Sequence, residues 1–169
     1  MSKLVILSGV PGSGKSYFSK SLKKLKSSHV YVVSSDELRR EITGIQSNLS
    51  EDELMWKLFY SLAKTFSLDK DGVVILDATH VTTELRVSKN KQLKKLFDLV
   101  YLVVWDINHE LVEDQNQQRD FPIPEEALKM FFNIFEMPSE KDYQFFDKVF
   151  IIKDHDITPA IKEIIGENG

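Results

Sequence analysis

The stretch GVPGSGKS, residues 9–16, decides the fold of this 169-residue chain. It follows an apolar run at residues 4–7 and precedes a helical pattern in which Phe18, Leu22 and Leu25 recur at i, i+4 and i+7. Strand, glycine-rich turn and helix are the setting in which G-x-x-x-x-G-K-S binds phosphate. We therefore predict a phosphate-binding loop here, and not a plain strand-to-helix turn with a solvated lysine.

The chemistry of this loop follows from its residue types. Glycine tolerates backbone angles that a side chain forbids, so successive N–H groups can point at phosphate oxygens at the positive end of the new helix. Lys15 adds a charge for the β- and γ-phosphates, and Ser16 offers a hydroxyl to Mg²⁺. The predicted nucleotide-binding residues of the loop are Gly9, Val10, Pro11, Gly12, Ser13, Gly14, Lys15 and Ser16.

The amino-acid composition excludes several classes of function for this protein. The net charge is -4 and the pI is about 5.6, so any contact with nucleic acid must be local. The chain contains no cysteine, which excludes disulfides, thiol nucleophiles and cysteine-ligated metals. The longest apolar run, residues 99–105, is too short to span a bilayer, and residues 4–7 are too short for a signal peptide. We expect a cytoplasmic protein with no membrane partner.

Four further apolar runs predict strands that alternate with helical patterns. They lie at residues 30–33, 73–76, 99–105 and 148–152. Such alternation produces right-handed βαβ units and a parallel sheet that is covered on both faces. We predict a single α/β P-loop kinase domain over residues 1–169, with the three-layer fold of P-loop NTPases and five parallel strands in the order 2-3-1-4-5.

The sequence also predicts local features of the helices. Ser50 has the position of a cap for a helix whose core stripe is Leu54, Leu58, Leu62 and Phe66, flanked by Met55, Phe59 and Ala63. Another helix is expected to run to about Phe97. Residues 109–124 read as a helix followed by a double-proline break, which is typical of an exposed lid.

Two carboxylates follow predicted strands at the edge where ligands bind in an open α/β sheet. Asp77 ends the third strand, either as a Mg²⁺ ligand or as a simple turn residue. Asp36 follows the second strand, either as a helix N-cap or as a base that accepts a hydroxyl proton during phosphate transfer. Arg39 lies one helical turn further on, either in a surface ion pair or as an anion clamp for the acceptor.

Several other polar residues can be interpreted either as solvent-exposed side chains or as functional groups. Arg119, before the double-proline break, is either a solvated arginine or a lid arginine that covers developing charge. The four histidines show no metal-ligand spacing, and His80 alone lies next to the predicted site. The lysines within residues 20–26 and 89–95 are interpreted as solvated helix faces.

Taken together, these motifs resemble the polynucleotide 5′-hydroxyl kinase branch of the P-loop kinases and, more widely, the zeta-toxin-like small kinases. The shared succession is GxPGSGKS, then SDELR at residues 35–39 (with Asp36-x-x-Arg39), DAT at residues 77–79, and Asn116-x-x-Arg119 before Pro-x-Pro. The sequence departs from this pattern at Gln115, where the family lid often has an arginine, and at His80, where asparagine is common.

The resemblance implies a mechanism and a set of partners. It makes ATP the donor and Mg²⁺ the cofactor, with Lys15 and the loop amides on the phosphates and Ser16 on the metal. It makes Asp36 the base, with Lys15 and Arg119 the other catalytic residues, and gives Arg119 a nucleotide contact as well. It also implies 5′ ends of DNA or RNA as acceptors and a phosphatase or ligase partner in trans. The residues it places at the acceptor are Asp36, Arg39, Asp77 and Thr79, with Asp77 also near the metal.

Two other functions fit part of the sequence. One is a kinase for a small hydroxyl compound such as a sugar, a nucleotide sugar or an antibiotic, which the acidic pI favours. The other is a non-catalytic nucleotide switch. The stretch NKQL at residues 90–93 superficially resembles a guanine-reading signature, but Leu93 replaces the aspartate that would bind the base, which disfavours a GTPase.

Overall fold

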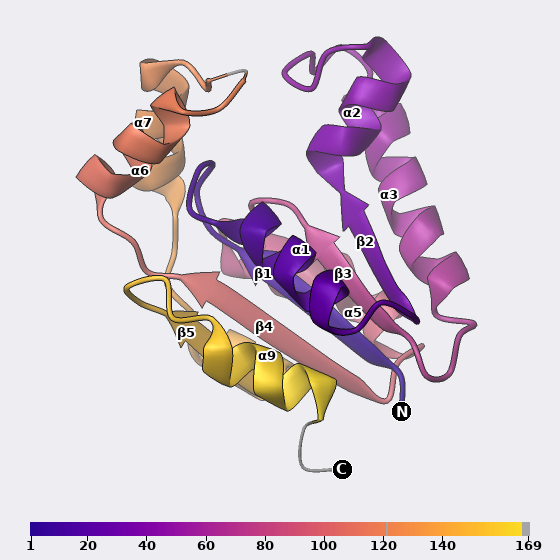
Figure 1. Ribbon diagram of the computed structural model, residues 1–169. Coiled ribbons are helices and arrows are strands. Elements are labelled where there is room, and N and C mark those ends of the chain that lie inside the picture. Colours follow the sequence, from indigo (N-terminus) through magenta and orange to yellow (C-terminus); the bar gives the residue numbers. More distant parts are fainter. Residues whose placement is uncertain (121, 167–169) are drawn as a thin grey trace.

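Five parallel strands form the central sheet of the protein (Figure 1). The computed structural model describes residues 1–120 and 122–166. In chain order the strands are β1 (Lys3–Ser8), β2 (Val30–Ser34), β3 (Val73–Asp77), β4 (Leu99–Trp105) and β5 (Lys148–Ile152). Across the sheet their order is β2-β3-β1-β4-β5, and every neighbouring pair is parallel. The predicted fold class and strand order are confirmed.

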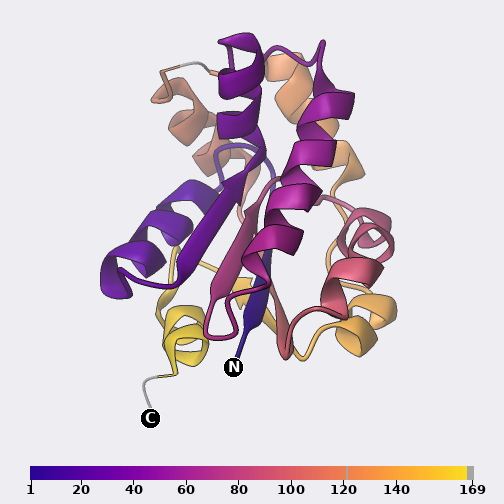
Figure 2. The same cartoon turned by 90° about the vertical axis from the view of Figure 1, so that its right-hand side faces the viewer.

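Helices cover both faces of this sheet (Figure 2). Their bounds are α1 (Lys15–Leu25), α2 (Ser35–Thr43), α3 (Asp52–Phe66), α4 (Thr83–Val87), η1 (Ser88–Asn90, a 3₁₀ turn), α5 (Lys91–Lys94), α6 (His109–Gln117), α7 (Glu125–Ile134), α8 (Glu140–Phe145) and α9 (Thr158–Ile165). Over residues 1–120 and 122–166, none of these helices combines the length and the apolar character needed to cross a membrane.

The alternation of side chains along β1 divides the core into two layers. Leu4 and Ile6 pack with α3, α5 and the end of α8, whereas Val5 and Leu7 pack with α1 and α9. All four side chains are fully buried, as expected for the central strand of a doubly covered parallel sheet. The strand therefore ends at a fixed point between the layers, and the phosphate loop begins there.

The predicted core stripe of α3 is wrong in its first half only, because Leu62 and Phe66 do pack against the core. Leu54 is 52% exposed and Leu58 is 37% exposed, whereas the expected flanking residues Met55, Phe59 and Ala63 are fully buried. The predicted stripe and the flanking residues both recur at helical spacing, so periodicity alone does not determine which set faces the sheet. The predicted Ser50 cap is also wrong, because α3 begins at Asp52 and its N-cap residue, Glu51, makes no side-chain cap.

The helix predicted to run to Phe97 is broken into α4, η1 and α5. At its start, Thr82 caps α4 through its hydroxyl, as the N–H of Leu85 donates to it. Within the predicted lid, α6 confirms the expected helix, and Phe121 lies outside the described residues. Figure 1 shows α6 and α7 on one side of the phosphate loop and α2 with α3 on the other.

Candidate functional site

The phosphate loop connects β1 to α1 and depends on glycine at two points. Gly14, the N-cap of α1, has a φ of 114°, a conformation that side chains rarely adopt. At Gly9 a Cβ atom would lie 2.6 Å from the hydroxyl oxygen of Ser13. These glycines allow the chain to turn tightly into the positive end of an eleven-residue helix.

Lys15 is buried within its own loop. Its ammonium group donates to the carbonyl oxygens of Gly9 and Val10, each at 2.9 Å. Burial lowers the pKa of Lys15 to about 8, although the carboxylates of Asp77 and Asp36 oppose this shift. A phosphate that enters the loop can therefore replace two carbonyl partners of a cation already positioned at the site.

Ser16 and Asp77 form a pair of oxygen ligands next to the loop. The Ser16 hydroxyl donates to a carboxylate oxygen of Asp77 over 3.2 Å. Burial raises the pKa of Asp77, while the charge of Lys15 and the Ser16 hydrogen bond lower it. A hydroxyl beside a carboxylate, open to phosphate and water ligands, fits the preference of Mg²⁺ for hard oxygens with few protein ligands.

Asp36 lies in the first turn of α2, which begins directly at the end of β2. The Ser34 hydroxyl caps this helix by accepting the N–H of Glu37. Asp36 is therefore not the N-cap of α2, which was the alternative to its role as a base. One carboxylate oxygen accepts from Arg39 at 3.2 Å and the other from Arg119 at 3.3 Å. The side chain remains 47% exposed and so accessible to a substrate.

Arg39 is held mainly by a partner that the sequence did not indicate. Its guanidinium donates to both carboxylate oxygens of Asp52, over 2.9 and 3.0 Å, and lies above the ring of Trp56. Its side chain is only 14% exposed. Arg39, which lies on α2 and is anchored to α3 by Asp52, therefore orients Asp36, and its guanidinium is largely occupied by protein groups.

A cavity of about 560 Å³ connects these groups. It brings together Ser16, Asp36, Asp77 and Arg119, four of the predicted site residues that come from distant parts of the chain. Arg39 and Thr79 are not among its lining residues. Thr79 instead supports the loop, because its carbonyl oxygen accepts the N–H of Gly9 at 2.9 Å. The remaining lining residues are Ser19, Lys20, Lys23, Val32, Ser34, Glu37, Arg40, Gln46, Gln118 and Asp120.

A second cavity, of about 330 Å³, lies at the carboxyl ends of β4 and β5. Its walls include Trp105, Leu111 and His155. Trp105 and His155 also flank the phosphate loop, because a Cβ atom at Gly14 would lie 3.3 Å from the Trp105 ring nitrogen. The amide nitrogen of Gln115 lies 3.1 Å from Nε2 of His155, so α6 contacts the rim of this cavity.

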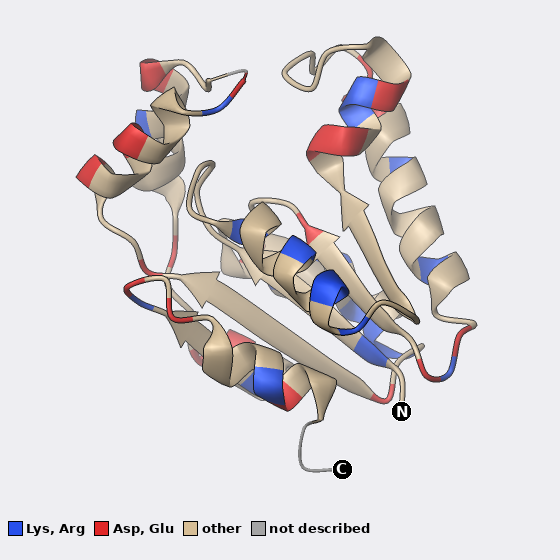
Figure 3. Cartoon of the chain, viewed as in Figure 1, with Lys and Arg blue, Asp and Glu red and all other residues tan. Residues whose placement is uncertain are grey.

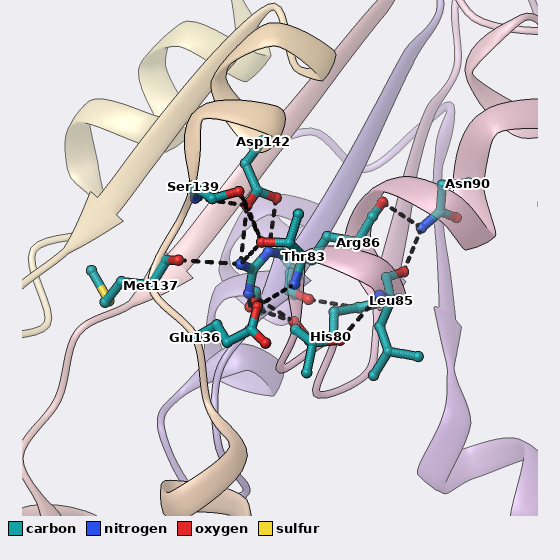
Figure 4. Close-up of polar contacts among 12 residues, drawn as sticks. His80, Thr83, Leu85, Arg86, Asn90, Glu136, Met137, Ser139 and Asp142 are labelled. Atoms are coloured by element: carbon teal, nitrogen blue, oxygen red, sulfur yellow. Dashed lines mark hydrogen bonds and ion pairs between the residues drawn. The ribbon is translucent and has the colours of Figure 1, made fainter.

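A buried polar cluster that the sequence did not indicate lies beneath the loop (Figure 4). Arg86 and Asp142 both have fully buried side chains and form a two-bond ion pair at 2.9 and 3.1 Å. Arg86 also donates to the Ser8 hydroxyl at 3.1 Å and to the His80 carbonyl at 3.2 Å. Ser8 immediately precedes the phosphate loop, so this cluster fixes the loop's starting point.

The pKa values of Asp142 and His80, both buried in this cluster, are set by different dominant causes. Burial acts to raise the pKa of Asp142, but hydrogen bonds from Arg86, from the Ser139 N–H and from Thr83 outweigh it and lower the pKa. Burial lowers the pKa of His80 to about 4, and its Nδ1 lies 2.7 Å from the Leu7 carbonyl. His80 is thus part of the support of the loop and does not line the open cavity.

Comparison with known proteins places this geometry in a family. A family model described as an AAA domain (AAA_33) matches residues 4–138. The chain belongs to this family. Its fold is also that of Kti12 from Chaetomium thermophilum, solved with ADP-AlF3, with a TM-score of 0.71 and 17% identity over 98% of this chain and 96% of that one.

Two further solved structures share the fold. A gluconokinase from Sinorhizobium meliloti 1021 has a TM-score of 0.60 and 16% identity over 98% of this chain and 88% of that one. The structure of the Pnkp1/Rnl/Hen1 RNA repair complex has a TM-score of 0.67 and 24% identity, over 86% of this chain and 46% of the matched chain. Family and fold together support a P-loop kinase that uses ATP, and they leave its acceptor open.

Proposed function

We propose that this protein transfers the γ-phosphate of ATP to the 5′-hydroxyl group of DNA or RNA. The observation that carries the proposal is the position of Asp36: its half-exposed carboxylate lies in the same cavity as Ser16 of the phosphate loop, between two arginines. A base beside the transferred phosphate is what a kinase needs in order to activate an alcohol.

ATP is expected to lie along the phosphate loop, with its nucleoside end toward the cavity at Trp105 and His155. The loop N–H groups and Lys15 bind its phosphates. Ser16 and Asp77 would hold Mg²⁺, which neutralises charge on the β- and γ-phosphates when it is bound.

The reaction then needs one proton transfer and one exchange of bonds. Asp36 accepts the proton of the acceptor hydroxyl as that oxygen bonds to the γ-phosphorus. The bond between the γ-phosphorus and the β,γ-bridging oxygen breaks, and ADP leaves with that electron pair. Lys15 and Arg119 stabilise the negative charge of the transferred group. Arg119 reaches it by exchanging its 3.3 Å contact with Asp36 for a phosphate oxygen.

The choice of a nucleic acid acceptor is supported by the Asp36-x-x-Arg39 spacing and by the fold shared with a chain of an RNA repair complex. The alternative acceptor is a small hydroxyl compound. The shared fold of the gluconokinase favours that alternative, as does the net charge of -4, which provides no general attraction for nucleic acid.

Transfer of labelled phosphate from γ-labelled ATP tests the proposal. The acceptors are DNA and RNA oligonucleotides with 5′-hydroxyl ends, beside a panel of sugars. We expect Asp36→Asn to lower the rate of transfer to oligonucleotides by about 100-fold or more. Asp120→Asn is the matched control, since it removes the same charge from another wall of the same cavity and is expected to change the rate only a few-fold.

The result against the proposal is equal inactivity of the wild-type protein and Asp36→Asn on every DNA and RNA acceptor. Transfer to a sugar by the wild-type protein in that same assay would then establish the alternative acceptor class. Nucleotide binding with no transfer to any acceptor would instead favour a nucleotide switch.

A further inference from the structure

One wall of the main cavity is a single face of α1. Ser16, Ser19, Lys20 and Lys23 all line the cavity, and their spacing of i, i+3, i+4 and i+7 places them on one side of the helix. From Ser16 to Lys23 this face extends for about 10 Å, at 1.5 Å of rise per residue. The wall therefore begins at the phosphate loop with hydroxyls and continues outward with two ammonium groups. Figure 3 shows Lys and Arg positions, in blue, along α1.

The opposite wall adds a third cation from α2. Arg40 lines the cavity and donates to the side chain of Gln46, another lining residue. Arg40, Lys20 and Lys23 are all exposed to solvent. The sequence pattern indicates only ordinary solvated helix faces for the two lysines and does not single out Arg40. The fold, however, turns all three side chains toward the cavity that contains Asp36.

Arg39 is poorly placed for the phosphate contact that the family resemblance gives it. Its guanidinium is committed to both oxygens of Asp52 and to Asp36, and it is not among the lining residues. A phosphate that recruited Arg39 would have to separate the two-bond ion pair that this residue forms with Asp52. The cations that face the cavity beyond Asp36 are instead those of α1 and its neighbour on α2.

The residues that line the main cavity also indicate which part of a nucleic acid the protein recognises. Among the described residues that line this cavity there is no aromatic side chain, so these residues offer no platform for stacking a base. Cations without stacking groups recognise the phosphates of a strand and are insensitive to its sequence.

We propose that Lys20, Lys23 and Arg40 bind the internucleotide phosphates of a single-stranded acceptor whose 5′-hydroxyl lies at Asp36. This inference rests on the proposed function and specifies its substrate as an oligonucleotide of several residues. In stacked geometry a strand carries one phosphate per about 3.4 Å. Lys20 and Lys23, about 4.5 Å apart along the helix axis, therefore match two successive phosphates, and Arg40 adds a contact for a third.

The test is the binding of fluorescently labelled 5′-hydroxyl oligonucleotides of one, two, four and eight nucleotides, measured by anisotropy over a range of salt concentrations. For the wild-type protein we expect the affinity to increase up to about four nucleotides. The Lys20→Ala/Lys23→Ala variant is expected to show no such dependence on length. The slope of its log affinity against log salt should fall by about 1.4, or about 0.7 for each phosphate of the single strand that the variant no longer neutralises.

Lys89→Ala/Lys91→Ala is the matched control, because it removes two exposed lysines from η1 and α5 on the opposite face of the sheet. We expect it to bind like the wild-type protein. Arg40→Ala should lower the slope by about a further 0.7 when it is added to the α1 double variant.

Two outcomes would overturn the inference, and they differ in what they say about the reaction. If acceptors of every length are phosphorylated and bound equally well, and the α1 double variant behaves like the control, the phosphate-binding wall is wrong but the 5′-hydroxyl kinase stands. If the wild-type protein neither binds nor phosphorylates nucleic acid but phosphorylates a sugar, both proposals fail.

Discussion

Two arginine–carboxylate clusters lie near the phosphate loop, and they differ in their access to water. In the buried cluster, Arg86 and Asp142 are both fully enclosed, and the guanidinium also binds Ser8. In the open cluster, Asp36 is 47% exposed and holds Arg119 by one contact of 3.3 Å. The donor–acceptor distances are similar in the two clusters, so burial and the number of partners distinguish them.

This difference assigns the two clusters to different tasks. A buried pair cannot exchange its partner for a substrate, and removal of one member leaves an uncompensated charge. An exposed pair contributes little to stability and is free to rearrange. The buried cluster therefore holds the base of the loop in place, while the open cluster supplies groups that change partners during a reaction.

The largest effect is expected from the open cluster, on the reaction rate. Arg119→Ala should lower kcat for phosphate transfer by about 1,000-fold or more, the range found for arginines that stabilise a transferred phosphoryl group. Its free energy of unfolding should change by no more than about 0.5 kcal/mol, as for a surface substitution. A kcat within tenfold of wild type would remove Arg119 from the reaction and make its contact with Asp36 a surface ion pair.

The next largest effect is expected from the buried cluster, on stability. Arg86→Ala should lower the free energy of unfolding by about 3–5 kcal/mol, because Asp142 is left buried without its partner. Arg86→Met combined with Asp142→Leu should cost less than Arg86→Ala alone, since it removes both charges. Urea denaturation measures both. A loss below about 1 kcal/mol for Arg86→Ala would mean that water reaches the cluster.

Acidification should also affect the buried cluster through His80. Its pKa is about 4 in the folded protein and 6.5 in the unfolded chain, so the unfolded chain binds more protons between these values. The contribution of His80 to stability is therefore complete above pH 6.5 and is lost as the pH falls toward 4. His80→Asn, which tolerates the φ of 40° at this position, should give a shallower decline over this range in denaturation experiments. If stability declined equally steeply with falling pH in the wild-type protein and in His80→Asn, the decline could not be assigned to His80.

The smallest effect is expected at the outer edge of the open cluster. Asp52→Asn weakens the ion pair that holds Arg39 and should lower the free energy of unfolding by about 1 kcal/mol or less, because both partners are partly exposed. Glu53→Gln, which removes an exposed partner of Lys57 on the same helix, is the control and should cost less still. A loss of about 3 kcal/mol for Asp52→Asn would instead make this pair behave like the buried cluster.

The sequence predicts the features that depend on neighbouring residues. The phosphate loop, the strand runs and the position of Asp77 at a strand end are all set locally, and the strand order is confirmed. The approach of Arg119 to Asp36 joins residues 83 positions apart and was expected only from the family resemblance. Those two residues meet because α6 and α2 stand on opposite sides of the loop, which no local pattern encodes.

Other features of the site could not be predicted because they depend on how elements pack. The pairing of Arg86 with Asp142 joins two short helices 56 residues apart, and an arginine in a short helix normally indicates exposure. The partner of Arg39, Asp52, comes from another helix. The rotation of α3 about its axis, which exposes Leu54 and buries Met55, is decided by the sheet beneath it.

The contacts at the C-terminal end of α6 have a thermodynamic consequence. Gln115 contacts His155 at the rim of the second cavity, and Arg119, two residues beyond the helix, contacts Asp36 in the first. One short segment, residues 115–119, thus contacts both cavities. Any ligand that shifts α6 at one cavity changes affinity at the other, and linkage requires the change to be equal in both directions. Cooperativity between two substrates can therefore arise here from the last turn of α6 and the two residues that follow it.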